Sequence, residues 1–174
     1  ILDTALARAA QWRQDGHDLP VAVGLRARDL LDPTLPAIIT AALRENELPA
    51  DRLILEIGEQ AVAAEPEVSS EAITRLSELD VGLALDDFGT GHFTLAQLAG
   101  LPLDEIRLHE TFTARLTDGS PDGPTIVRAA VVLAHALGLR TAAEGLHSPE
   151  LAHAAFRSRC HSGQGSYFSR PLSA

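Results

Sequence analysis

The chain has 174 residues, of which 45% are hydrophobic and 22% are charged, and this balance is typical of a single globular domain over residues 1–174. Its formal net charge of −10 argues against binding to duplex DNA, and no apolar run is long enough for insertion into a membrane. The single cysteine, Cys160, excludes an internal disulfide and fits a reducing compartment such as the cytoplasm.

Hydrophobic periodicity predicts helices and strands that alternate along the chain. In chain order, the sequence predicts a helix over 2–12, a strand over 19–23, a helix over 36–43, a strand over 53–57, a helix over 72–79, a strand over 81–85, a short helix over 93–98, a strand over 104–108, a helix over 124–137, a strand over 139–143, a helix over 149–156 and a short strand over 165–168. This alternation indicates a parallel sheet with helices outside it.

The number of predicted strands leaves two architectures open. A closed parallel barrel has eight strands and takes about 250 residues, so this chain is too short for a complete one. We therefore weigh an open doubly wound sheet against a barrel without its first strand units. The sequence contains no Met, which favours an α/β barrel that is incomplete at the N-terminus.

Acidic side chains stand at the ends of several predicted strands, namely Glu56, Asp86, Asp87 and Glu144. Because the carboxyl ends of parallel strands meet at one rim, we expect these acids to lie together. Crowded carboxylates repel one another unless a cation lies among them, and oxygen ligands suit Mg²⁺, Mn²⁺ or Ca²⁺. The alternative is that each acid caps the helix that follows it. The set as a whole favours a metal site.

Five ordered segments resemble the EAL domain family, bacterial phosphodiesterases of the second messenger cyclic di-GMP. These segments are LILEIGE at 53–59, DDFGTG at 86–91, LPLDEIRLH at 101–109, AEGLH at 143–147 and QGSYFSRP at 164–171. The resemblance covers essentially the whole chain. It implies a modified TIM barrel, a site for two divalent ions (Mg²⁺ or Mn²⁺) whose bound water attacks a phosphodiester, a homodimer, and other signalling domains in the same protein.

The resemblance also implies roles for individual residues. Metal-binding positions fall on Glu56, Asp86, Asp87 and Glu144, and catalytic positions fall on Arg107, Glu144 and Gln164. Glu59 matches a glutamate that steadies the loop from Asp87 to Gly91. In this way the resemblance reaches the same acids as the strand-end pattern.

Several positions depart from the family pattern. The metal-binding Asn of the family is Gly24 in this chain, and the family Lys is Arg107, which cannot exchange a proton near neutral pH. His109, His147 and His161 replace three family acids, and the E-A-L motif would lie upstream of this chain. We therefore expect a damaged two-metal site.

Three functions compete on these grounds. The favoured one is a degenerate EAL domain that regulates rather than hydrolyses. The second is an active phosphodiesterase that releases the linear dinucleotide, and the third is nucleotide binding without turnover, with Arg170, Arg26 or Arg28 meeting a phosphate. A further hypothesis is that His109, His147 and His161 form a zinc site together with the acids.

Overall fold

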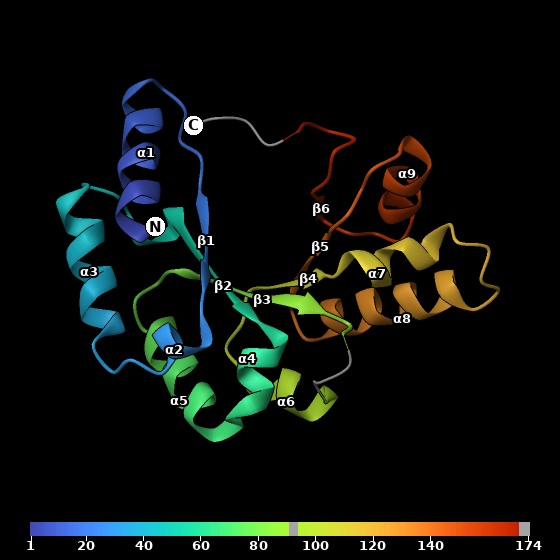
Figure 1. The fold of residues 1–174 in the computed structure, drawn as a ribbon, viewed down its shortest axis with the longest axis horizontal. Coiled ribbons are helices and arrows are strands. Elements are labelled where there is room, and N and C mark those ends of the chain that lie inside the picture. The colour runs from blue at the N-terminus through green and yellow to red at the C-terminus, as the bar shows by residue number, and fades with distance from the viewer. Residues whose placement is uncertain (91–93, 171–174) are drawn as a thin grey trace.

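A single parallel sheet organises the fold. The computed structural model describes residues 1–90 and 94–170, and within them lie six strands. These are β1 (Val21–Leu25), β2 (Leu53–Gly58), β3 (Gly82–Phe88), β4 (Glu105–Leu108), β5 (Arg140–Ala143) and β6 (Ser162–Gly163). Their order in the sheet is their order in the chain, whereas a doubly wound sheet reverses its order at a switch point. The predicted α/β barrel architecture is confirmed, as a curled half-barrel (Figure 1).

Helices connect the strands and surround the outer face of the sheet (Figure 1). They are α1 (Leu2–Gln14), α2 (Ala27–Leu30), α3 (Leu35–Glu45), α4 (Glu59–Ala64), α5 (Pro66–Ser77), α6 (Leu95–Gly100), α7 (Glu110–Thr113), α8 (Gly123–Ala136) and α9 (Pro149–Arg157), with short 3₁₀ turns η1 (Ala50–Arg52) and η2 (Ala114–Leu116). In the part of the chain that the structure describes, no helix has the length and hydropathy needed to cross a lipid bilayer.

Three of these helices are not predicted from the sequence, and each begins within two residues of the end of a strand. They are α2, α4 and α7, and they contain only four to six residues. A helix of that length shows less than two turns of hydrophobic periodicity, so the pattern has too few repeats to be recognised. The predicted helix over 93–98 begins at Leu95, where Thr94 forms a capping box with Gln97. Phe93, the predicted first residue, lies outside the described residues.

Side-chain alternation in β2 separates a buried apolar face from an inner face that carries Glu56. In β2, Leu53, Leu55 and Ile57 are fully buried toward the helices, whereas Ile54 and Glu56 point to the inner face and are partly exposed. This two-residue period arises because successive side chains of a regular strand point to opposite faces. Polar groups on the inner face therefore need no place in the hydrophobic core.

The predicted strand over 165–168 is wrong, because the last strand lies earlier, at Ser162–Gly163. Residues 165–168 turn against the segment after β5 instead. The backbone N–H of Tyr167 donates to the carbonyl of Leu146 at 3.0 Å, and that of Phe168 donates to Gly165 at 3.1 Å. Gly165 packs so closely on the Leu146 backbone that any Cβ there would clash. Gly165 therefore allows a close approach of two backbone segments and does not belong to a strand ladder.

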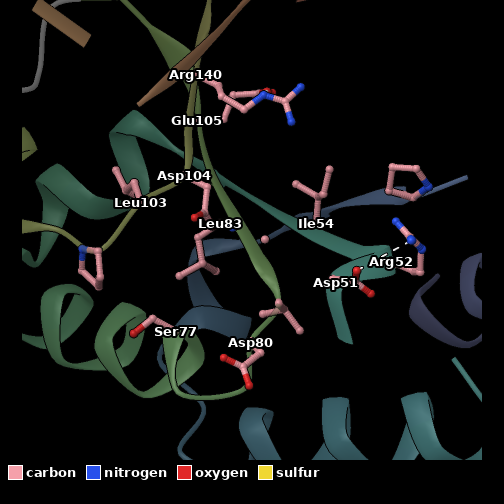
Figure 2. Close-up of a pocket in the computed structure, with 14 residues that line it drawn as sticks. Asp51, Arg52, Ile54, Ser77, Asp80, Leu83, Leu103, Asp104, Glu105 and Arg140 are labelled. Atoms are coloured by element: carbon pink, nitrogen blue, oxygen red, sulfur yellow. Dashed lines mark hydrogen bonds and ion pairs between the residues drawn. The ribbon is translucent and has the colours of Figure 1, made fainter. Parts of the chain in front are cut away.

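A hollow of about 690 Å³ lies at the other end of the strands, where they begin. Figure 2 shows Asp51 and Arg52 on one side of it, with Glu105 and Arg140 on another. Nε of Arg140 lies 3.7 Å from Oε2 of Glu105, and the Arg140 side chain is 63% exposed. This hollow contains none of the acids that the sequence assigns to the rim.

Candidate functional site

Four acids and one arginine lie together at the carboxyl ends of the strands. They are Glu56 in β2, Asp86 and Asp87 in β3, Arg107 in β4, and Glu144 directly after β5. The parallel registers align these ends, since Gly58 pairs with Asp86 and Leu108 pairs with Ala143. The acids that the sequence predicts to converge are therefore gathered at one rim rather than distributed over separate surfaces.

Arg107 lies at the centre of this group, with a side chain that is only 11% exposed. Its Nη1 forms an ion pair with Glu56, its Nη2 lies 2.9 Å from Oε1 of Glu144, and its Nε lies 3.8 Å from Oδ1 of Asp86. Nη2 also donates a hydrogen bond to Oε1 of Gln164, which follows β6. A guanidinium presents its donors in a fixed planar fork, so one side chain lies near oxygens from β2 and β3 and from the residues that follow β5 and β6, although its Nε has no hydrogen-bond partner.

Asp86, Asp87 and Glu144 each offer a carboxylate oxygen, and these oxygens lie within 4.8 Å of one another. Burial raises the pKa of the Asp86 carboxyl, and the charge of Asp87 raises it further. Burial also raises the pKa of Glu144, and the charge of Asp86 adds to this while Arg107 opposes it. Oδ1 of Asp86 is buried without a hydrogen-bond donor. A divalent cation would satisfy this oxygen and relieve the repulsion among the three acids.

An irregularity in β3 brings two consecutive acids to the rim. The pairing of β3 with β4 shifts register between Leu85 and Phe88, and Asp87 has a φ of 60°. Aspartate tolerates this left-handed conformation better than most residues do. As a result, oxygens of both Asp86 and Asp87 reach the same cluster.

Glu59 holds the loop that follows β3. Glu59 is the first residue of α4 and is nearly fully buried, at 1% exposure. Its Oε2 accepts hydrogen bonds from the backbone N–H of Gly89 at 2.9 Å, and from the N–H and hydroxyl of Thr90 at 3.2 and 3.3 Å. Gly89 adopts a φ of 103° and packs against Phe112, where a Cβ would clash with the ring. Gly91, the last residue of the motif, lies outside the described residues.

The three histidines of the zinc hypothesis do not come together. The N–H of Thr111 donates to Nδ1 of His109, which leaves the proton of a neutral ring on Nε2, 3.8 Å from Asp87. His161 precedes β6 and accepts from the N–H of Thr141 near the start of β5, away from the rim. In the described residues, only Asp86, Asp87 and Glu144 form a group with metal-site spacing. The histidine site is therefore not supported.

Two residues complete the surroundings of the rim. Gly24 lies opposite Glu56 in the register of β1 and β2, and a Cβ there would lie 4.0 Å from Oε2 of Glu56. Arg170 lines a hollow of about 560 Å³ together with Gln164, the hydrogen-bond partner of Arg107. Arg26 is already committed to Asp29, with Nε 2.6 Å from Oδ2. Pro171, the last residue of the closing motif, lies outside the described residues.

A parallel half-barrel with carboxylates at the carboxyl ends of its strands is the architecture of a TIM-barrel-like protein with a rim site. A profile of the EAL domain matches residues 1–171, and the chain belongs to the EAL domain family. It is 34% identical over 174 residues to the cyclic di-GMP phosphodiesterase PdeR of Escherichia coli, covering 100% of this chain and 26% of PdeR.

Two further comparisons agree with this assignment. The bifunctional diguanylate cyclase/cyclic di-GMP phosphodiesterase MucR of Pseudomonas aeruginosa is 33% identical over 175 residues, which cover 100% of this chain and 25% of MucR. A solved structure of the PaMucR phosphodiesterase in a c-di-GMP complex has a TM-score of 0.93 and 33% identity, covering 99% of this chain and 70% of that chain. The chain spans only 21% to 29% of the length of curated relatives that it matches.

Proposed function

We propose that this EAL domain binds cyclic di-GMP with one divalent ion, turns it over too slowly to serve as a phosphodiesterase, and acts as a regulatory module. The observation that carries the proposal is Gly24, which lies opposite Glu56 and has no side chain to offer an ion. The family resemblance implies a metal-binding Asn at this position. Two-ion hydrolysis needs both ions to be held in place, so the loss of this ligand favours binding over turnover.

The described residues fit one divalent ion better than two. Asp86, Asp87 and Glu144 have the spacing of a metal site, and Asp86 contributes a buried oxygen without a donor. A second ion would draw on Glu56, whose carboxylate is already paired with Arg107, and on Gly24, which has no side chain to donate a ligand atom. When bound, a divalent ion polarises a phosphoryl oxygen and offsets its charge.

The charge at the rim makes the ion a condition for nucleotide binding. Four carboxylates and one guanidinium formally leave three negative charges uncompensated. A phosphodiester is also negative, so its approach to the rim is unfavourable until a divalent ion reduces this excess. We therefore expect nucleotide binding to depend on the ion.

The hollow beside the rim offers room for the rest of the nucleotide. It measures about 560 Å³, within the range of small-molecule sites, and it is lined by Gln164, Phe168 and Arg170 among others. Phe168 is 60% exposed and offers an aromatic face on which a guanine base can stack. Arg170 supplies a positive charge at the same hollow for the second phosphate.

Calorimetric titration of cyclic di-GMP into the purified chain tests this function, together with chromatography of the reaction mixture for the linear dinucleotide. We expect binding in Mn²⁺, none in a chelator, and no burst of product. The D86N and E144Q variants should lose binding, because they remove charge from the three-acid group. Rapid hydrolysis that disappears in D86N would refute the regulatory proposal. Absence of binding with every divalent ion would refute the assignment of cyclic di-GMP as the ligand.

An active phosphodiesterase is the second candidate, and the surviving machinery supports it. Asp86, Asp87 and Glu144 keep their metal-site spacing, Arg107 contacts Asp86 and Glu144, and Gln164 contacts Arg107. On this alternative Arg107 would hold the phosphate, but its contacts with Glu56 and Glu144 already occupy two of its nitrogens. Steady-state product formation at a catalytic rate would favour this candidate over the regulatory one.

Partners are also part of the proposal. The relative MucR is a bifunctional diguanylate cyclase/cyclic di-GMP phosphodiesterase, which supports a place for this domain beside other signalling domains. We also propose a homodimer through the helices beside the loop after β3. A largely apolar hollow of about 420 Å³ lies between α5 and α6, where Ala96 and Leu101 line it. Light scattering of the A96E variant tests this, since a buried glutamate should dissociate a dimer into monomers.

A further inference from the structure

Arg107 is the only basic side chain in the described residues that joins several rim acids at once. It contacts Glu56 on β2, Asp86 on β3 and Glu144 after β5. We propose that Arg107 is a tethered cation that takes the place of one divalent ion, stabilises the acid cluster without metal, and lowers the affinity of the cluster for the remaining ion. This role concerns ion binding and stability, so it holds whether or not the domain hydrolyses a nucleotide.

The burial of the acids makes a resident positive charge necessary. The side chains of Glu56, Asp86 and Glu144 are 16%, 28% and 20% exposed, so water screens their mutual repulsion only in part. Partly buried carboxylates need a counter-charge, and a guanidinium carries one at every pH at which the protein is folded. The Gln164 amide fixes the fork by accepting a hydrogen bond from Nη2. The chain itself therefore compensates part of the negative charge of the cluster through Arg107.

The guanidinium and a divalent ion compete for the same oxygens. Glu144 belongs to the three-acid group of metal-site spacing, yet its Oε1 lies 2.9 Å from Nη2 of Arg107. Asp86 belongs to the same group, and its Oδ1 lies 3.8 Å from Nε. An ion that binds there must share these oxygens and also lie close to a fixed positive charge, which repels it. Removal of the guanidinium should therefore strengthen ion binding.

The Arg107 guanidinium also lies where a second ion would have to bind. Its Nη1 pairs with Glu56, the residue that faces Gly24 across β1 and β2. A side chain at position 24 would enter this same space, because a Cβ there would lie 4.0 Å from Oε2 of Glu56. The positive charge of Arg107 therefore lies beside Glu56. A second ion at this place would need Glu56 and residue 24 as ligands.

The test compares wild type with R107Q and R107K in the absence of nucleotide, with Mn²⁺ as the probe. Calorimetric titration measures the Mn²⁺ affinity, and thermal unfolding measures the midpoint with chelator and with saturating Mn²⁺. We expect R107Q to bind Mn²⁺ about tenfold more tightly than wild type, since it loses a nearby repulsive charge. Its midpoint should fall below that of wild type in chelator and rise with Mn²⁺ by more than the wild-type midpoint does. R107K should lie between the two.

R140Q is the matched control, because Arg140 also lies on the inner face of the sheet but pairs with Glu105 at the far end of the strands. It should leave the Mn²⁺ affinity and the Mn²⁺-dependent shift unchanged. Equal Mn²⁺ affinity in wild type, R107Q and R107K would overturn the proposal. So would an R107Q chain that stays unfolded in saturating Mn²⁺, because the ion should replace the lost charge. None of these measurements involves cyclic di-GMP, so they fail or succeed separately from the proposed function.

Discussion

Gly24 and Glu56 are direct partners in the register of β1 and β2, and they stand at the edge of the acid cluster. Oε2 of Glu56 would lie 4.0 Å from a Cβ at position 24, which is an ordinary van der Waals contact. The backbone at Gly24 is not among those with positive φ, so a side chain is conformationally allowed there. One residue therefore separates the present rim from a rim with an additional ligand.

The G24N substitution should create this ligand at little cost in stability. The amide oxygen of the new side chain can reach the space beside Glu56, and oxygen donors are preferred by Mg²⁺ and Mn²⁺. We expect the Mn²⁺ affinity to increase about tenfold in calorimetric titration. The double variant G24N/R107K should increase further and should gain measurable hydrolysis of cyclic di-GMP.

A22N is the control for this substitution. Ala22 lies two residues earlier on the same face of β1, pairs with Ile54 and is exposed. The same amide placed there stays distant from the acids, so Mn²⁺ affinity should not change. Equal gains in A22N and G24N would show that the effect does not arise at the rim.

The E59Q substitution should loosen the loop after β3. Glu59 is buried and accepts hydrogen bonds from the backbone N–H groups of Gly89 and Thr90. A glutamine would either point its own NH₂ group at these N–H donors or leave one of them without an acceptor. We expect a loss of about 2 kcal/mol in the free energy of unfolding, measured by urea denaturation. E71Q on the exposed face of α5 is the control and should change the stability by less than about 0.5 kcal/mol.

Stability in chelator should fall as the pH rises through the raised pKa values of Asp86 and Glu144. Burial is the main cause in both cases, and it makes the folded chain hold these protons more tightly than the unfolded chain does. The decline should therefore begin near the ordinary values of 3.8 and 4.5 and continue above them, through the raised values. Thermal unfolding at a series of pH values measures this decline.

The D86N variant separates this effect from the general titration of the chain. It removes one buried charge, so near neutral pH in chelator its unfolding midpoint should lie above that of wild type, with a flatter pH dependence. In Mn²⁺ the order should reverse, because the variant has lost an ion ligand. E78Q, at an exposed position, should follow the wild-type curve throughout. A steeper decline in D86N would contradict this account.

Cys160 should react slowly in the folded chain. Burial raises the pKa of its thiol to about 11, with a hydrogen bond to Thr141 opposing the shift. At pH 8 only about one thiol in a thousand is then the reactive thiolate. Modification by a chromogenic disulfide reagent should be slow in the native chain and fast in urea. Comparable rates in both states would show that the thiol is not protected.

Most of the strands could be predicted because parallel sheets leave a simple trace in the sequence. The apolar run at 53–57 and the strand at 104–108 lie where the structure has β2 and β4. The last strand could not be located in this way. Gly163 in this strand and Gly165 after it fit closely against Leu146, and such a long-range contact has no local signature.

The gathering of acids at the rim followed from strand ends, which also place Arg107 there, but the ion pairs of Arg107 did not. Sequence spacing puts Arg107 on the inner face, whereas its partners Glu56 and Glu144 come from strands far away in the chain. His161 shows the opposite error, because its ring binds the Thr141 backbone near the start of a strand. A spacing rule gives the face of a residue, and only the folded chain gives its neighbours.

The register shift in β3 has a consequence for how this domain tolerates change. In an even strand, adjacent residues face opposite sides, so one of Asp86 and Asp87 would be driven in among the hydrophobic helices. The φ of 60° at Asp87 prevents this by redirecting the chain for a single residue. Mutations that favour a smooth strand at this point, such as a valine in place of Asp87, would therefore harm the domain twice, through a missing oxygen and through a backbone that resists the bend.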